Sequence, residues 1–169
     1  MYRAAILTIS DKGHAGERED RSGEAIREIL LTKGYTVAHY AILPDERERI
    51  AAELARLADQ DVAELILTTG GTGFSPRDVT PEATTAVCER LCPGIPEAMR
   101  AMSMEKTRRA MLSRAVAGLR GGSLLINLPG SPKAVRECLE CVIDEVAHGL
   151  DILRGNAAEC GSGQARIQS

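Results

Sequence analysis

Short apolar runs alternate with amphipathic stretches through the first half of the chain. Residues 2–10, 36–43 and 65–69 are short and mostly apolar, which predicts buried strands. Residues 22–33 and 46–58 carry apolar side chains at the spacing of one helical face, which predicts amphipathic helices between the strands. Strands that alternate with helices predict βαβ units. The expected fold class is therefore α/β, a three-layer α/β/α sandwich with a mostly parallel central sheet.

Two helix-start signatures occur in the second half of the chain. The segment Thr80-Pro81-Glu82 combines a capping residue, a proline and an acid in the first turn, so Thr80 is expected to be the N-cap of a helix. Ser131-Pro132 repeats the pattern before an apolar stripe in residues 132–148, which predicts another helix. Residues 96–111 form a further helical stretch by the same spacing.

The remaining apolar runs and the C-terminal composition set the expected domain organisation. Residues 115–119 and 123–128 read as two strands joined by a glycine-containing turn. From about residue 155 the chain is small and polar, and no linker or internal repeat precedes it. We therefore expect a single domain over residues 1–154 and a flexible C-terminal tail over residues 155–169.

Composition argues against nucleic-acid and membrane partners. The 169 residues suit one domain with a proper core, and aromatic residues make up only 2%, so stacking platforms for single-stranded nucleic acid are scarce. The formal net charge is −3 and no long basic run occurs, so the electrostatic footprint of a DNA-binding domain is missing. No apolar run approaches the length of a membrane span, and the N-terminus lacks the features of a signal peptide. The expected location is the cytoplasm.

The five cysteines do not form a disulfide pattern. They are Cys88, Cys92, Cys138, Cys141 and Cys160, an odd number in a chain without a signal peptide. Cys138 and Cys141 lie three residues apart in a predicted helix, where cysteine behaves as a small apolar residue. A zinc site that joins them to Cys88 and Cys92 is the less favoured alternative, because the spacing is loose.

Ligands of open α/β sheets bind at the carboxyl ends of the strands, which selects four loops here. These loops span residues 10–20, 44–45, 70–80 and 129–131. The third contains Gly70, Gly71 and Gly73 directly after an apolar strand and before a predicted helix start, as expected of a phosphate cradle. It is neither a Walker A loop nor a dinucleotide fingerprint. The alternative is that the glycines only serve a tight turn.

Charged residues in and near the glycine-rich loop extend the phosphate hypothesis. Arg77 can clamp phosphate oxygens with its forked donors. Asp78 lies in the same loop, and Asp45 is expected to arrive from a neighbouring strand end; two such carboxylates can hold Mg²⁺ against a polyphosphate. The alternatives are a helix N-cap for Asp45 and an ion pair with Arg77 for Asp78. Ser113, next to Arg114, is polar in an apolar context, and a simple loop ion pair explains that segment equally well.

Residues 67–84, LTTGGTGFSPRDVTPEAT, closely resemble the signature of the MogA/MoaB family of molybdenum cofactor biosynthesis proteins, which is related to the plant and gephyrin G domains. The resemblance extends to three further parts of the chain. They are residues 8–11 with 20–23, residues 93–100, and residues 127–132 after 113–114. Together they cover nearly the whole chain up to about residue 153.

The resemblance implies a molybdopterin-binding domain and a reaction. MogA-type members transfer AMP from MgATP to molybdopterin and release pyrophosphate, so ATP and molybdopterin are the expected substrates and Mg²⁺ the expected ion. A downstream molybdate-insertion protein is the expected partner, and a homotrimer or homohexamer the expected assembly. The alternative is a MoaB-like molybdopterin-binding protein, a cofactor carrier or a scaffold without this activity. An unrelated phosphohydrolase is a third hypothesis.

The resemblance and the loop reasoning together give the candidate site residues. Asp45 and Asp78 are the expected catalytic residues and the expected metal ligands. The residues expected to bind the substrates lie in the four loops, at their strand ends and before the last hairpin. They are Ser10, Asp11, Thr69, Gly70, Gly71, Thr72, Gly73, Arg77, Ser113, Pro129, Gly130 and Ser131.

Overall fold

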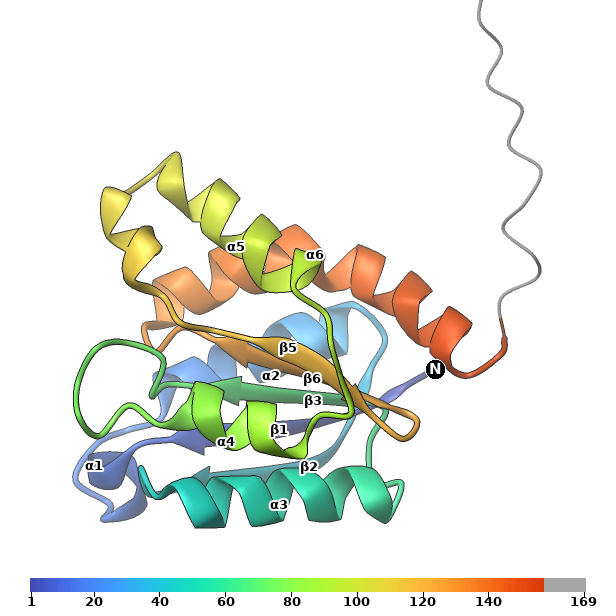
Figure 1. Ribbon diagram of the computed structural model, residues 1–169, viewed down its shortest axis with the longest axis horizontal. Coiled ribbons are helices and arrows are strands. Elements are labelled where there is room, and N and C mark those ends of the chain that lie inside the picture. Colours follow the sequence, from blue (N-terminus) through green and yellow to red (C-terminus); the bar gives the residue numbers. More distant parts are fainter. Residues whose placement is uncertain (157–169) are drawn as a thin grey trace, which may run out of the picture.

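A computed structural model describes residues 1–156 of the chain, and these residues form a six-stranded sheet (Figure 1). The strands are β1 (Arg3–Ile9), β2 (Thr36–Leu43), β3 (Leu65–Thr69), β4 (Arg90–Leu91), β5 (Ala117–Arg120) and β6 (Ser123–Leu128). Their order across the sheet is β2-β1-β3-β6-β5-β4. The first four strands in that order are parallel, while β5 and β4 pair antiparallel at one edge.

Helices cover both faces of the sheet, so the predicted three-layer α/β/α architecture is confirmed. The helices are α1 (Asp11–His14), α2 (Arg21–Thr32), α3 (Arg47–Asp59), α4 (Thr80–Val87), α5 (Gly94–Met104) and α6 (Pro132–Leu153), with a 3-10 helix η1 (Arg108–Leu112). One face carries α2, α5 and α6, and the other carries α3 and α4 (Figure 1). No helix among the described residues has both the length and the apolar character needed to cross a bilayer.

The central strands are buried on both faces because their side chains alternate between two cores. In β1, Ala4 and Ile6 pack under α2 and α6, whereas Ala5 and Leu7 pack under α3. All five residues of β3 are buried, and Leu65 and Leu67 lie in one core while Ile66 lies in the other. Parallel strands covered on both faces read as continuous apolar runs in the sequence, which is why these strands could be located from the pattern alone.

The predicted helix over residues 96–111 is wrong, since the structure divides it. Helix α5 ends at Met104, and the chain turns before the separate helix η1. Thr107 has an extended backbone, and its side chain accepts a hydrogen bond from the backbone N–H of Arg109. A residue that caps a new helix cannot continue the previous one, so the periodic pattern spans two elements.

Three other expectations are corrected at the ends of helices and strands. Thr80 is not an N-cap: Val79 holds that position, and the Thr80 hydroxyl is buried without a hydrogen-bond partner among the described residues. The stretch after β1, predicted as a loop, contains the short helix α1, capped by the Ser10 hydroxyl, which accepts from Gly13 N at 3.0 Å. The two-residue strand β4 was not predicted.

The last helix, α6, begins where the sequence predicts and ends later than predicted. Ser131 is the N-cap of α6, and its hydroxyl accepts from Ala134 N at 3.2 Å. The helix continues to Leu153, because its apolar stripe does too: Leu150 is fully buried. The tail predicted for residues 155–169 lies, from residue 157 on, outside the described part of the chain.

Candidate functional site

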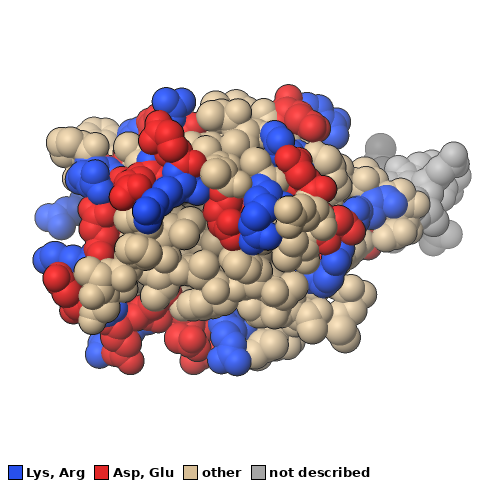
Figure 2. Space-filling view, turned by 90° about the horizontal axis from the view of Figure 1, so that it is seen from below, with Lys and Arg blue, Asp and Glu red and all other residues tan. Residues whose placement is uncertain are grey.

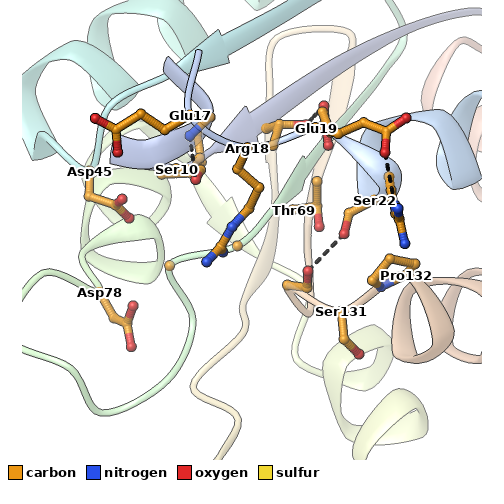
Figure 3. A pocket seen from close by; sticks show the side chains of 18 residues that line it. Ser10, Glu17, Arg18, Glu19, Ser22, Asp45, Thr69, Asp78, Ser131 and Pro132 are labelled. Carbon is orange, nitrogen blue, oxygen red and sulfur yellow. Dashed lines mark hydrogen bonds and ion pairs between the residues drawn. The ribbon is translucent and has the colours of Figure 1, made fainter. Parts of the chain in front are cut away.

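A large cleft lies at the carboxyl ends of the parallel strands and has a volume of about 880 Å³ (Figure 3). Three stretches of backbone surround it: the segment from the end of β1 into α2, the start of the glycine-rich loop after β3, and the loop between β6 and α6. Asp45, directly after β2, and Asp78, just before α4, complete its lining. The cleft therefore lies at the edge where the rule for open α/β sheets places ligands.

The glycine-rich loop requires glycine at its first two positions. Gly70 and Gly71 have φ angles of +96° and +65°, in the left-handed region. A Cβ atom on Gly70 would lie 2.4 Å from the carbonyl oxygen of Ile9, and one on Gly71 would lie 2.3 Å from Thr80 Oγ1. Both glycines line the cleft. They therefore form a tight turn and also expose backbone without side chains to the cleft.

Asp45 and Asp78 both line the cleft, and in each carboxylate one oxygen accepts a hydrogen bond from a backbone N–H. Asp45 Oδ2 accepts from Asp11 N at 2.9 Å, and Asp78 Oδ2 accepts from Ser75 N at 2.9 Å. Neither Oδ1 atom accepts a hydrogen bond from the described residues. Burial raises the pKa of the Asp45 carboxyl, and the nearby Asp11 carboxylate adds to that effect, although the Asp11 amide opposes it.

The alternative roles considered for the two aspartates are wrong. The N-cap of α3 is Glu46, so Asp45 does not cap that helix. Arg77 does not pair with Asp78: its Nε and Nη2 donate to the Asp11 carboxylate at 3.0 and 2.8 Å. The hydrogen bonds from Arg77 hold the pKa of Asp11 below its usual value. Arg77 itself does not line the cleft.

Arg18 is a cleft residue that the sequence did not single out. Figure 3 shows its side chain projecting into the cleft, between Asp45 and Asp78 on one side and Thr69 and Ser131 on the other. Its guanidinium makes no hydrogen bond or ion pair with the described residues, whereas Arg21, the other arginine of the lining, pairs with Glu19 at 3.0 Å. In the sequence Arg18 is one of many charged residues in a loop, with no motif to distinguish it.

A partly buried hydrogen-bond cluster centred on Asp20 fixes one wall of the cleft. Asp20 Oδ1 accepts from Gly23 N at 2.8 Å, and its Oδ2 accepts from the hydroxyls of Thr8 and Tyr40. Three donors on one carboxylate hold the start of α2 against β1 and β2. The next residue but one, Ser22, donates to Gly130 O at 2.7 Å and so fixes the opposite wall.

A second, smaller cavity of about 240 Å³ lies between α5, η1 and the start of α6. Most of its lining is apolar, and it includes Met99, Ala115 and Cys138. Ser113 and Pro129 line this cavity rather than the large cleft. Since Gly130 and Ser131 line the large cleft, the loop between β6 and α6 borders both spaces.

The predicted site residues therefore divide into three groups. Those that line the large cleft are Ser10, Asp45, Thr69, Gly70, Gly71, Asp78, Gly130 and Ser131. Ser113 and Pro129 line the second cavity. Asp11, Thr72, Gly73 and Arg77 line neither. Protein contacts explain the last group: Asp11 and Arg77 hold each other, and the carbonyls of Thr72 and Gly73 accept hydrogen bonds from Arg114.

The carboxylates of the cleft fit a metal that arrives with its ligand better than a resident metal. Among the described residues, no group of three histidine, cysteine or acidic side chains could hold an ion alone. Asp45 and Asp78 each retain one free oxygen at the cleft. Mg²⁺ commonly binds one or two carboxylates and fills its other positions with water and substrate phosphates. The two aspartates have the right chemistry for that arrangement.

Comparison with known proteins gives a consistent set of relatives. The profile of a family described as "Probable molybdopterin binding domain" matches residues 5–148. A Helicobacter pylori protein named molybdopterin adenylyltransferase is 44% identical over 153 residues, 89% of this chain and 87% of that protein. The crystal structure of the Thermus thermophilus molybdopterin biosynthesis enzyme MoaB superposes with a TM-score of 0.87 at 50% identity and covers 92% of this chain and 98% of its own. The Mog protein of Mycobacterium ulcerans gives a TM-score of 0.85 at 36% identity, over 90% and 99% of the two chains.

Proposed function

This chain belongs to the MogA/MoaB family of molybdopterin-binding domains, and from that membership we propose that it is a molybdopterin adenylyltransferase. The reaction moves the adenylyl group of ATP to molybdopterin and releases pyrophosphate. The observation that carries the proposal is the cleft, in which Asp45 and Asp78 face a turn of bare glycine backbone at Gly70 and Gly71. A backbone cradle beside two carboxylates suits a polyphosphate that carries a divalent cation.

The proposed chemistry needs positioning and charge stabilisation rather than a covalent protein intermediate. A terminal phosphate oxygen of molybdopterin attacks the α-phosphorus of ATP. The bond from that phosphorus to the oxygen bridging the β-phosphate breaks, and pyrophosphate leaves. The glycine backbone and the N-terminus of α6 at Ser131 would orient the phosphates, and Arg18 would offset the charge on them.

Mg²⁺ enters this proposal as part of the substrate MgATP. Bound to the phosphates, the ion supplies charge neutralisation to the departing pyrophosphate. Asp45 and Asp78 would bind it through the oxygens that the backbone leaves free. Without a cation, two carboxylates beside a polyphosphate would repel it.

The second cavity suits a ring system of one of the two substrates. Its lining is mostly apolar and includes a few polar side chains such as Ser113. Ligand pockets of this kind bury a flat apolar body and orient it with a few hydrogen bonds. Because the loop of Pro129, Gly130 and Ser131 borders both spaces, one molecule can place its ring in the cavity and its phosphate in the cleft.

The setting of the reaction is also proposed. We place the protein in the cytoplasm and expect it to pass its product to a molybdate-insertion protein. A homotrimer or homohexamer is supported by large apolar side chains that the single chain leaves exposed. Phe74, Met111 and Leu112 are 69%, 60% and 45% exposed. Exposed apolar groups of this size are often covered in assemblies.

The alternative function is molybdopterin binding without adenylyl transfer, as in a carrier. The 50% identity to a structure named MoaB is the observation that favours it. Both functions require the pterin to bind, and only the transferase requires the carboxylates of the cleft to act on ATP. The substitution Asp78→Asn therefore distinguishes them.

We expect Asp78→Asn to retain molybdopterin binding and to reduce kcat by about 10²-fold or more, which is typical for loss of one electrostatic group in an active site. The amide can still accept the hydrogen bond from Ser75 N, so the loop should be preserved. Equilibrium dialysis measures binding, and pyrophosphate release measures turnover. The matched control is Asp144→Asn, on the exposed surface of α6, which should change neither. Full turnover in Asp78→Asn would contradict the proposed role.

A further inference from the structure

One side chain outside the large cleft contacts both ends of the loop that carries Asp78. Arg114 Nε donates to Gly73 O at 2.7 Å, and its Nη2 donates to Asp78 O at 2.6 Å. Its remaining nitrogen, Nη1, pairs with the carboxylate of Glu82 on α4. The backbone N–H of Arg114 also donates to Thr72 O at 3.0 Å. One residue thus closes a six-residue loop, residues 73–78, from the outside.

Apart from Arg114, the ion pair of Arg77 with Asp11 ties the loop to the rest of the described chain. The loop contains no helix or strand, and Phe74 at its tip is 69% exposed. Within it, Asp78 N donates to Ser75 O and Ser75 N donates to Asp78 Oδ2, both at 2.9 Å. Gly73 lies against the same carboxylate, since a Cβ there would be 2.9 Å from Asp78 Oδ2. The direction of the Asp78 carboxylate therefore depends on how the ends of the loop are held together.

We propose that Arg114 is a positioning residue for Asp78: by holding Gly73 O and Asp78 O on one guanidinium, it directs the Asp78 carboxylate into the cleft. Arg114 does not line that cleft, so it acts through Asp78. The expected effect of Arg114 on kcat rests on the proposed adenylyl transfer. The expected effect of Arg114 on the shape of the loop does not depend on that function.

Only arginine can make these contacts together. The guanidinium is a planar fork of several donors, and it reaches three acceptors on separate parts of the backbone and side chains. A lysine would keep the positive charge beside Glu82, but its compact ammonium group cannot span the two carbonyls. The ion pair itself is partly exposed, with Glu82 at 45%, and such exposed pairs contribute little to stability. Two hydrogen bonds to the loop, rather than charge, are therefore the functional contact.

The position of Arg114 also connects the two spaces of the site. The preceding residue, Ser113, lines the second cavity. Arg100 Nη1 donates to Ala115 O at 3.0 Å and so fixes the same short segment from α5. The segment that holds the Asp78 loop is thus part of the wall of the neighbouring cavity. A shift of Arg114 would consequently disturb the loop that carries Asp78.

The test compares Arg114→Lys and Arg114→Ala with Glu82→Gln in the full chain. Hydrogen exchange of the amides in residues 73–78 measures the loop without any substrate. Steady-state kinetics with molybdopterin and ATP give kcat and KM separately. We expect both Arg114 variants to speed exchange in the loop and to reduce kcat by about 10–100-fold with KM changed less than about threefold, since a small misplacement of a catalytic group has effects of that order. Glu82→Gln should behave as the wild type in both measurements.

Two results would overturn the inference. The first is recovery of wild-type kcat and exchange by Arg114→Lys, or an equal loss in Glu82→Gln, because either would show that only the ion pair matters. The second is a loss of kcat in the Arg114 variants without faster exchange in residues 73–78. If the wild type forms no product, the proposed function fails, and the exchange measurement still decides whether Arg114 holds the loop. If Arg114→Ala does not fold, the test can still be made with Arg114→Lys, which retains the positive charge.

Discussion

At the scale of single residues, the two aspartates of the cleft differ in their surroundings. Asp45 is partly buried, and burial raises the pKa of its carboxyl. Asp78 lies in a loop that is closed by Arg114. A raised pKa means that the protein holds a carboxylate where its charge is costly, which is common at functional sites. We therefore regard Asp45 as a residue kept for function at some cost in stability.

The substitution Asp45→Asn should reduce turnover by about 10²-fold and raise the Tm at neutral pH. Because the folded-state pKa of Asp45 lies above its unfolded value, this group stabilises the fold at low pH and loses that contribution as pH rises through the folded pKa. The neutral amide avoids the loss, and it can still accept the bond from Asp11 N. Thermal unfolding of both proteins across the acid and neutral range measures the difference.

The expected gain in Tm should shrink as the pH falls, because the wild-type carboxyl then becomes protonated as well. The exposed carboxylate of Asp144 provides the control, since Asp144→Asn should show no comparable gain. A Tm of Asp45→Asn below that of the wild type at neutral pH would contradict the view that burial of the charge is costly.

At the scale of elements, the sequence predicted best where the pattern and the local chemistry agree. The strands at residues 36–43, 65–69 and 123–128 have their predicted bounds. The last two are fully buried and form continuous apolar runs, whereas the first lies at the edge of the sheet and is bounded by the turn residues Gly34 and Pro44. The boundary between α5 and η1 was missed, because the capping role of Thr107 depends on its backbone conformation. Periodicity finds a face, but it does not show where hydrogen bonding restarts.

A buried amide ties helix α4 to the sheet, and no pattern of apolar residues indicates it. Asn127 on β6 is fully buried, and its Nδ2 donates to Thr68 Oγ1 on β3 and Thr84 Oγ1 on α4. Its Oδ1 accepts from Val116 N at 3.2 Å. All the polar atoms of this side chain are thus used. Because α4 follows the loop of Asp78, this contact supports the site from behind.

Replacement of Asn127 by alanine should lower the free energy of unfolding by about 2–3 kcal/mol, since the lost amide leaves the Thr68 hydroxyl and the Val116 N–H without the partner they have in the folded chain. The Thr84 hydroxyl keeps its bond to Thr80 O. Chemical denaturation measures the change. The matched control is Asn156→Ala, an exposed asparagine with one long contact to Tyr2, which should change stability by less than about 0.5 kcal/mol. A similarly small change in the free energy of unfolding for Asn127→Ala would show that the amide contributes little to stability.

At the scale of the whole molecule, topology explains which parts of the site could be found from the sequence. The strands β1, β3 and β6 are neighbours in the sheet and parallel, so the loops that follow them meet at one edge. The same rule predicts from the sequence that the loops of Ser10, Gly70 and Ser131 lie together. The rule does not say which side chains turn into the cleft. Arg18 and the clamp by Arg114 depend on contacts between distant segments, which the sequence does not display.

The distribution of charge agrees with a small-molecule site. Figure 2 shows acidic and basic side chains interspersed on the face seen from below, on the side of α3, without a broad area of one sign. Such a face offers no continuous track for a nucleic-acid backbone. The cleft, in contrast, combines several carboxylates with one unpaired arginine, Arg18. The charged side chains that are available to a ligand therefore lie in the cleft at the carboxyl ends of the strands.

The most direct test of the central claim is transfer of label from ATP carrying a radioactive α-phosphate. The purified protein is incubated with labelled ATP, molybdopterin and Mg²⁺, and the products are separated by chromatography. Adenylyl transfer predicts label in a molybdopterin product together with an equal amount of pyrophosphate. Tight binding of molybdopterin with all label remaining in ATP would contradict the claim and favour a carrier. Release of orthophosphate without a labelled pterin would instead indicate a phosphohydrolase.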